Sequence, residues 1–515
     1  MKLLAVTELL FSPFKIAFLI LWFYLCMYLV QRFEFNPLIG GRLKVWTNVL
    51  MLFAAPVVLL LAFTYAVFKK VEETGASVAE AAVTTFGHAI RTIKRTALGG
   101  ARGSSSIILL DPSGKSINEV YGGQSKDDNA KKTVAVAERL IGDAVELLAS
   151  DILINPAENL EYDIRFRVDG VLSPYREIDS NICGALVNSI KAISGMDISE
   201  KRRPQDGAFV AKVPDGTVSF RVASAGILHG EKLSIRILNQ KLAPQTLPDV
   251  GMDERTCRIV RDVLNRESGM MLLCGPTGSG KSTTLYAMLR EIDFYTRNVI
   301  TIEDPVEYVL TGASQIEVNP KADITFAKAL RSILRQDPDI ICVGEIRDEE
   351  TASISLKASQ TGHLVLATLH SSSNSASLVR LMDLGISPLL MASGLDLVIS
   401  QRLVRKLCNN CKKVARLDGP HKQAFLQKNI DPVSIYVPVG CNKCSDTGYK
   451  GRIAVFDIMV IDNEVKNKIS EGKITIAGST KDDQQMRSNL QKQAMKLAVA
   501  GITSLDEVKK VTSQG

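Results

Sequence analysis

A glycine-rich segment near the middle of the chain has the composition and spacing of a phosphate-binding loop. Residues 275–282 read Gly-Pro-Thr-Gly-Ser-Gly-Lys-Ser, after an apolar stretch at 269–274 and before a helical one at 283–290. Such glycines let consecutive backbone N–H groups wrap phosphates at the positive end of a helix, while the lysine reaches the β and γ phosphates. The pattern predicts that ATP is bound by Gly275, Pro276, Thr277, Gly278, Ser279, Gly280, Lys281, Ser282 and Thr283, and that Ser282 ligates Mg²⁺.

Two further apolar stretches end in acidic residues. Residues 299–302 lead into Glu303, with Glu307 four positions later, and residues 340–343 lead to Glu345. In parallel sheets the carboxyl ends of the strands form the side where ligands bind. Hydrolysis of ATP needs acids there to hold Mg²⁺ and to orient the attacking water. These three glutamates are therefore candidate catalytic residues.

Two of the five histidines flank one apolar stretch of the same region. His363 precedes residues 364–369 and His370 follows them. An isolated histidine is more often structural than functional, but this concentration around one predicted strand makes both of them candidates for the site.

Four of the nine cysteines form two CxxC pairs, and the members are Cys408, Cys411, Cys441 and Cys444. Two such pairs supply four thiolates within tetrahedral reach, which is the arrangement of a closed structural zinc site. A disulfide is disfavoured in a cytosolic domain, and a redox CxxC needs only one copy. The spacing therefore predicts Zn²⁺ bound by four cysteines.

The elements that position these residues change character along the chain. From about residue 247 the pattern alternates helix and buried strand, which is typical of a parallel α/β domain. Upstream, residues 162–168, 218–222 and 233–238 alternate apolar and polar side chains, which predicts a half-exposed antiparallel sheet. Apolar residues at helical spacing from 134 to 148 predict a helix beside that sheet.

The N-terminus carries two apolar segments, at residues 16–30 and 46–68. A helix needs about 20 apolar residues to cross a bilayer, so the second segment is long enough and the first is shorter. Two spanning helices are the favoured interpretation, with one span plus a re-entrant or interfacial segment as the alternative. No small-residue cleavage site of a signal peptide follows the first segment. Basic residues after Phe68 assign the flanking side to the cytoplasm.

Composition and charge are those of an ordinary globular protein. The 515 residues are 46% hydrophobic and 23% charged, and they are sufficient for about three domains. A net charge of +7 is small for this length and is weak evidence for a nucleic-acid partner.

These segments resemble the secretion ATPase superfamily, which powers type II secretion and type IV pilus assembly. Residues 301–308, Thr-Ile-Glu-Asp-Pro-Val-Glu-Tyr, are similar to the Asp box of that family. Residues 334–348 are similar to its Walker B segment, and residues 361–370 to its His box. The likeness runs from about residue 144 to residue 511.

The resemblance implies an architecture and a set of roles. Its fold class is α/β: a RecA-like P-loop ATPase domain, preceded by a PAS-like α+β domain whose strands carry Arg221 and Arg236. In the family such arginines approach the nucleotide when the two domains close. Glu345 then becomes the Mg²⁺-side acid, and Glu303 and Glu307, which the sequence does not separate, become candidates for activating water. His363 and His370 are assigned to sensing the γ-phosphate.

Two positions depart from the family pattern. Ala208 stands where the family usually has arginine, and Leu153 where it usually has histidine. Both positions lie outside the nucleotide motifs, so they put contacts between the two domains in doubt rather than the activity.

The cysteine pairs discriminate within the family. They are typical of assembly and secretion members rather than of pilus retraction ATPases. The resemblance implies a homo-hexamer that acts on a polytopic inner-membrane platform protein, with the ATPase domains in the cytoplasm. Typical members of the family are peripheral, so it is the two apolar segments, not the resemblance, that predict an N-terminus in the lipid of the bacterial inner membrane. The alternative is a DNA-translocating or conjugation-type ATPase with the same core.

The domains expected are two membrane helices in 1–70, a linker and short ordered segment in 71–132, the PAS-like domain in 133–243 and the ATPase domain in 244–515, with the zinc subdomain at about 402–452.

Overall fold

The computed structural model describes residues 107–122, 128–157, 161–214, 216–238, 246–415, 435–472 and 478–513. The described residues all belong to one compact unit that begins at Ser105. The predicted membrane helices in residues 1–70 lie outside the described residues. Among the helices that are described, none is long and apolar enough to cross a membrane.

The first domain is built on a seven-stranded antiparallel sheet with the order β1-β5-β6-β7-β2-β3-β4. This confirms the predicted antiparallel sheet. Part of the segment expected to be linker, residues 71–132, contributes β1 and the start of α5. The elements are β1 (Ile108–Leu110), η1 (Asn118–Gly122), α5 (Asp128–Glu146), β2 (Ala149–Pro156), β3 (Glu161–Val168), β4 (Val171–Asp179), α6 (Ser180–Ile193), β5 (Gln205–Val213), β6 (Gly216–Ile227) and β7 (Gly230–Leu238).

Helices α5 and α6 contribute to the apolar core of this sheet. Alternation along β6 buries Val218, Phe220 and Val222 in that core, and Phe220 stacks on Phe209 of β5 with ring centroids 4.6 Å apart. Because successive side chains of a strand point to opposite faces, Arg221 lies on the other face of the sheet.

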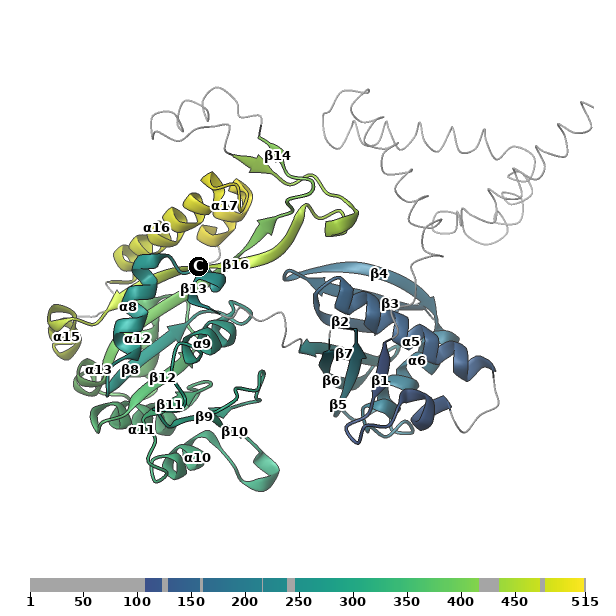
Figure 1. Cartoon of the computed structure of the whole chain (residues 1–515), viewed down its shortest axis with the longest axis horizontal. Coiled ribbons are helices and arrows are strands. Elements are labelled where there is room, and N and C mark those ends of the chain that lie inside the picture. The colour runs from purple at the N-terminus through teal and green to yellow at the C-terminus, as the bar shows by residue number, and fades with distance from the viewer. Residues whose placement is uncertain are drawn as a thin grey trace, which may run out of the picture. The chain divides into compact units, whose positions relative to one another are not determined.

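The second domain is built on a sheet with the order β10-β9-β11-β12-β8-β13-β16, in which all neighbours are parallel except β13 and β16. This confirms the predicted α/β domain (Figure 1). Its elements are α7 (Leu247–Val250), α8 (Glu254–Leu264), β8 (Gly269–Cys274), α9 (Lys281–Leu289), β9 (Val299–Glu303), β10 (Ser314–Glu317), η3 (Pro320–Ala322), α10 (Phe326–Ile333), β11 (Ile340–Val343), α11 (Glu349–Gln360), β12 (Leu364–Leu369), α12 (Asn374–Asp383), α13 (Pro388–Gly394) and β13 (Leu395–Leu407).

Both faces of this sheet are buried. Met270 and Leu272 of β8 belong to a cluster with α10, α11, α12 and α13, whereas Met271 and Leu273 belong to a second cluster with α7, α8 and α9. A strand covered on both faces is apolar at every position, which explains the unbroken apolar runs in the sequence.

The C-terminal part completes the sheet and covers its end. Strand β16 pairs with β13, and α16 and α17 pack on these two strands through Leu490, Ala494 and Val508. The elements are β14 (Lys413–Val414), β15 (Tyr436–Val437), η5 (Asn442–Cys444), β16 (Tyr449–Val460), α15 (Asn463–Ser470), α16 (Gly478–Val499) and α17 (Leu505–Ser513).

A buried ion pair in the first domain generates a stability prediction. Lys191 of α6 is fully buried, and its Nζ lies 2.6 Å from the carboxylate of Glu231 and 2.6 Å from the carbonyl of Glu200. We expect Lys191→Met to lower the free energy of unfolding by about 3–5 kcal/mol, because it leaves a buried carboxylate without a partner. Urea unfolding of the first domain measures this. The double variant Lys191→Met/Glu231→Leu should recover most of the loss; equal losses in both variants would contradict the explanation.

Candidate ATP site and cysteine cluster

The glycine-rich loop lies between β8 and α9, as predicted. Gly278 and Gly280 have φ values of +76° and +88°, a region that side chains other than glycine rarely adopt. Gly280 is the N-cap residue of α9 and, having no side chain, does not cap the helix. The N-cap residue therefore leaves the first-turn N–H groups open to an anion, as at a phosphate site at a helix N-terminus.

The side chain of Lys281 is folded over this loop. Its Nζ donates to the carbonyl oxygens of Gly275 at 2.9 Å and Pro276 at 3.2 Å, and only 8% of the residue is exposed. Burial lowers the pKa of Lys281, and the nearby carboxylate of Glu345 acts in the opposite direction. The ammonium thus lies in a desolvated pocket, where its attraction for phosphate oxygens is stronger than in water.

His370 connects Lys281 to Glu345. Its Nδ1 is 3.4 Å from Lys281 Nζ, and its Nε2 is 3.1 Å from Glu345 Oε1. Burial and the charge of Lys281 lower the pKa of His370, although Glu345 opposes them. A neutral ring fits these contacts, because Nδ1 then accepts from the ammonium while Nε2–H donates to the carboxylate. The structure thus brings three predicted site residues together from α9, β11 and β12.

Arg347 holds the other side of Glu345. Its Nε donates to Glu345 Oε2 at 2.9 Å, and its NH1 donates to Asp304 Oδ2 at 2.9 Å. This arginine therefore ties together the acidic ends of β9 and β11. The sequence interpretation did not select it, although it lies within the segment similar to a Walker B motif.

His363 is not brought to the P-loop. It lies before β12, whose Leu364 pairs with Gly269 at the beginning of β8, whereas Leu369 pairs with Cys274 at its end. Six strand residues at about 3.3 Å each separate the two histidines. The ring of His363 instead lies 3.2 Å from the carbonyl of Ala358, close to the end of α11.

Glu303 and Glu307, which the sequence did not distinguish, have different surroundings. Glu303 is buried, and its oxygens accept from the hydroxyls of Tyr286 and Thr301 and from the amide of Gln315. Glu307 lies on the loop after β9. Burial raises the pKa of Glu307, and the positive charges of Arg236 and Arg221 partly offset that rise. Glu303 is thus held by neutral donors, whereas Glu307 lies in the field of both predicted arginines.

Arg221 and Arg236 are directly opposite each other on β6 and β7. Arg236 Nε lies 3.5 Å from Asp151 of β2, and Arg221 NH2 lies 3.7 Å from Glu317 of β10. Like charges paired across strands repel, and these two carboxylates offset that repulsion. The sequence interpretation missed both carboxylates, since they lie far from the arginines along the chain.

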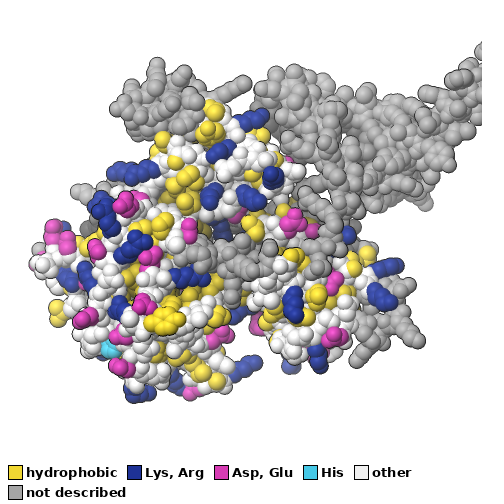
Figure 2. All heavy atoms as spheres, in the orientation of Figure 1, with side chains coloured by type: hydrophobic (Ala, Val, Ile, Leu, Met, Phe, Trp, Pro, Cys, Tyr) yellow, Lys and Arg dark blue, Asp and Glu magenta, His cyan; other side chains and the backbone are white. Residues whose placement is uncertain are grey.

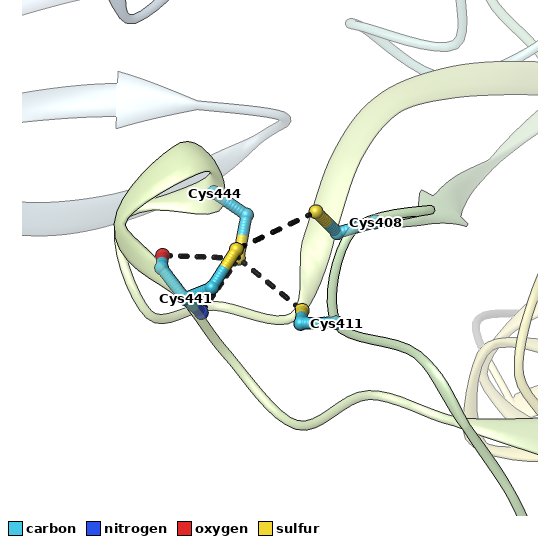
Figure 3. Close-up of side chains that lie close together, drawn as sticks. All are labelled: Cys408, Cys411, Cys441 and Cys444. Atoms are coloured by element: carbon cyan, nitrogen blue, oxygen red, sulfur yellow. Dashed lines mark hydrogen bonds between the residues drawn. The ribbon is translucent and has the colours of Figure 1, made fainter.

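The four predicted cysteines form one cluster (Figure 3). The Sγ atoms all lie within 4.8 Å of one another, and the Cys408–Cys441, Cys411–Cys444 and Cys441–Cys444 separations are 3.8, 3.8 and 3.7 Å. A tetrahedron with metal–sulfur bonds of about 2.3 Å has edges of about 3.8 Å, whereas a disulfide needs about 2.05 Å. The spacing thus fits a tetrahedral metal site and excludes disulfides in this arrangement.

Hydrogen bonds to sulfur support the same interpretation. The N–H groups of Cys441 and Gly448 point at Cys444 Sγ, at 3.2 and 3.3 Å. Burial alone would raise the pKa of the Cys441 thiol, but hydrogen bonds from Asn410 and from the backbone of Lys443 outweigh it and lower the pKa to about 6, whereas burial raises the pKa of Cys411 to about 12 and also raises that of Cys444. Thiolate is the form that binds metal.

Comparison with known families gives a match over most of the chain. Residues 125–510 match the model of the family described as "Type II/IV secretion system protein". The chain is similar to the type II secretion system ATPase E of Vibrio cholerae, with 39% identity over 394 residues, which are 76% of this chain and 77% of that protein. It is also 40% identical over 389 residues to the type IV pilus assembly ATPase PilB of Acinetobacter baylyi, which covers 74% of this chain and 66% of that protein.

Among solved structures, the ATPase DotB of Legionella pneumophila has a similar fold. The TM-score is 0.55 with 21% identity, and the likeness covers 74% of this chain and 96% of that one. At this identity the comparison supports the fold alone.

The close approach of β13 to the P-loop generates a binding prediction. A Cβ at Gly275 would lie 2.4 Å from Ser279 Oγ and 2.8 Å from the carbonyl oxygen of Gln401. We therefore expect Gly275→Ala to displace the loop and to weaken binding of a fluorescent ATP analogue by at least about tenfold, equivalent to about 1.4 kcal/mol. Gly362→Ala is the matched control, because it also has a positive φ but no atom within 4 Å. Equal affinities of the two variants would contradict the steric argument.

Proposed function

We propose, from the premise that this chain belongs to the type II/IV secretion system protein family, that it powers the assembly of a type IV pilus or of the pseudopilus of a type II secretion system. The family match and the relatives establish that the chain is an ATPase. The assembly role rests on the relatives, and its ATP chemistry rests on the Lys281–His370–Glu345 arrangement, which places a cation, a hydrogen-bonding ring and an acid together at the P-loop.

In the proposed mechanism the P-loop N–H groups and Lys281 bind the phosphates, and His370 contacts the γ-phosphate. Ser282 and Glu345 would hold Mg²⁺, which neutralises charge on the phosphate oxygens when bound. Arg347 fixes the orientation of Glu345 by donating to one of its oxygens. Phosphoryl transfer depends mainly on positioning and on electrostatic stabilisation, which is what this arrangement supplies.

We assign activation of the attacking water to Glu307 rather than to Glu303. A general base needs a free carboxylate oxygen within reach of its proton. The oxygens of Glu303 are engaged by Tyr286, Thr301 and Gln315. Glu307 has a raised pKa, as expected of an acid adapted for proton transfer near neutral pH. Glu303 instead positions α9 and β10 relative to β9.

Arg221 and Arg236 supply positive charge from the first domain. A guanidinium is permanently charged and matches phosphate oxygens with a planar fork. Both arginines act electrostatically on Glu307. We propose that they move onto the phosphates as the two domains close, and that hydrolysis and product release reverse this motion within a hexameric ring acting on an inner-membrane platform protein.

The cysteine cluster is proposed to bind structural Zn²⁺, and the residues present fit it in number, spacing and sulfur hydrogen bonding. When bound, the ion would fix four thiolates in one rigid unit. The two cysteine pairs join the end of β13 to the beginning of β16, because Cys408 follows Leu407 and its N–H donates to the carbonyl of Gly448.

Residues 1–70 are proposed to anchor the ATPase in the bacterial inner membrane, on the strength of the uncharged stretch at 46–68. A DNA-translocating role is the rival. It would call for a continuous basic surface, whereas on the face shown in Figure 2 basic and acidic side chains are interspersed over the described part of the chain.

Three variants test the catalytic assignment. We expect Lys281→Ala to abolish ATP binding, and Glu307→Gln to bind ATP but to lower kcat by about 10²- to 10⁴-fold, as for loss of a general base. Glu303→Gln should lower the thermal unfolding temperature, because its new NH₂ group must face a donor: the hydroxyl of Tyr286 at one oxygen position, or Thr301 and Gln315 at the other. Retained hydrolysis by Lys281→Ala would refute the P-loop assignment, and a normal kcat for Glu307→Gln would refute the role of Glu307.

The same variants separate the two biological roles. Chromosomal Lys281→Ala and Glu307→Gln strains should lose surface pili or secreted proteins while DNA transfer is unaffected. A defect in DNA transfer alone, with salt-sensitive DNA binding by the purified protein, would favour the rival.

Metal analysis tests the cysteine cluster. We expect about one zinc ion per chain, and we expect Cys444→Ser to lose the metal and to unfold at a lower temperature, because metal binding and folding of such sites are coupled. Cys257→Ala, a buried cysteine outside the cluster, should keep the metal. A full complement of zinc in Cys444→Ser would contradict the assignment.

A further inference from the structure

One residue of β13 lies against the P-loop, and the next residue is a buried arginine. Strand β13 pairs in parallel with β8 as far as Ser400, which is opposite Cys274. The next residue, Gln401, is buried and donates from Nε2 to the carbonyl oxygen of Ser279 at 2.8 Å. Its own carbonyl oxygen lies so close to Gly275 that a Cβ there would be only 2.8 Å away. Strand β13 therefore forms one wall of the phosphate site.

Arg402, the next residue, projects to the other face of β13, towards the loop before α12, and is buried, with 6% of its surface exposed. Its guanidinium donates from NH1 to the carbonyl of Gln401 at 3.1 Å and from NH2 to the carbonyl of Ser372 at 2.7 Å. Both acceptors are neutral. Within the part of the chain that the structure describes, no carboxylate forms an ion pair with Arg402, whereas Arg405, three positions along, pairs with Glu507 at 2.7 Å.

A buried cation without a counter-charge is unfavourable unless another group compensates it. Burial lowers the pKa of Arg402. The positive charge of Arg402 also acts on Lys281 and contributes, after burial, to the lowering of the pKa of that lysine, so the two cations lie close enough to interact. Ser279 Oγ, in the P-loop that faces this wall, is buried and has no hydrogen-bond partner among the residues that the structure describes.

We propose that the phosphates of the bound nucleotide are the missing counter-charge of Arg402, and that this arginine makes the site prefer the more highly charged triphosphate over the diphosphate. The proposal rests on the proposed function, in that ATP binds at the P-loop. Arg402 is a specificity-determining residue for the number of phosphates on the nucleotide. Its buried charge is unfavourable while the site is empty, and it stabilises the site once phosphates are bound. Its hydrogen bond to Ser372 also fixes the loop that follows His370.

The competing explanation is purely structural, with Arg402 only tying the loop at Ser372 to β13. The two explanations differ in how affinity depends on phosphate number. Loss of the Arg402 charge weakens binding more for a nucleotide that carries more negative charge. Loss of the hydrogen bond to Ser372 displaces the loop and lowers the affinity for all nucleotides by one common factor.

The test measures dissociation constants of AMP, ADP and the non-hydrolysable analogue AMP-PNP by calorimetry, with the full-length protein, Mg²⁺ and constant ionic strength. In Arg402→Met we expect the preference for AMP-PNP over ADP to fall at least about tenfold, as for loss of a desolvated charge interaction. Arg402→Lys, which keeps the charge, should keep the preference within about threefold of wild type. Arg402→Gln applies the same criterion if the methionine variant does not fold.

The matched control is Arg297→Met. Arg297 also donates to two carbonyls, those of Leu264 at 2.7 Å and Arg266 at 2.9 Å, but it precedes β9 at the opposite edge of the sheet. The Arg297→Met substitution should leave the preference for AMP-PNP over ADP unchanged. A common loss of affinity for all three nucleotides in Arg402→Met, or no loss, would overturn the proposal. Wild-type binding by Lys281→Ala would instead show that the P-loop assignment itself is wrong.

Discussion

Strands β9, β11, β12 and β8 all run in the same direction, and the candidate ATP site is assembled where they end, beside the middle of the parallel strand β13. Each of the four delivers one kind of group to that edge: Glu303 from β9, Glu345 after β11, His370 after β12 and the glycine-rich loop after β8. The register of the paired strands decides which residues lie close together at this edge. Because Leu369 pairs with Cys274, the residue after β12 lies beside the beginning of the P-loop. The chemistry of the site therefore depends on a backbone alignment maintained by two buried apolar faces.

Much of this alignment was predictable from the sequence. Fully apolar strands that end in acids, and a glycine-rich loop between strand and helix, are local patterns, and parallel strands share one functional edge. The antiparallel sheet of the first domain followed from the alternation along β3, β6 and β7. The four cysteines followed from spacing alone, because two CxxC pairs carry their geometry in the sequence.

Other features were not predictable, for physical reasons that differ. His363 and His370 are equivalent in the sequence, but a strand has two ends and only one faces the nucleotide. Glu303 and Glu307 differ because Tyr286 and Gln315, from other elements, occupy the oxygens of one and not of the other. Arg402 belongs to no motif that was recognised, and its burial depends on Ser372, 30 residues away. The predicted membrane segments lie outside the described residues.

Strand β13 connects several parts of the second domain, and this affects how that domain unfolds locally. Over its first half it is hydrogen-bonded to β8 and β16 on its two sides, and over its second half to β16. It carries Gln401 at the P-loop, Arg405 on the carboxylate of α17 and, one residue past its end, Cys408. Amide protons along such a strand exchange only when the whole unit opens. Strand β13 thus connects the proposed nucleotide pocket, the C-terminal helices and the cysteine cluster by continuous hydrogen bonding, so that opening of the strand at one of them is expected to loosen the other two.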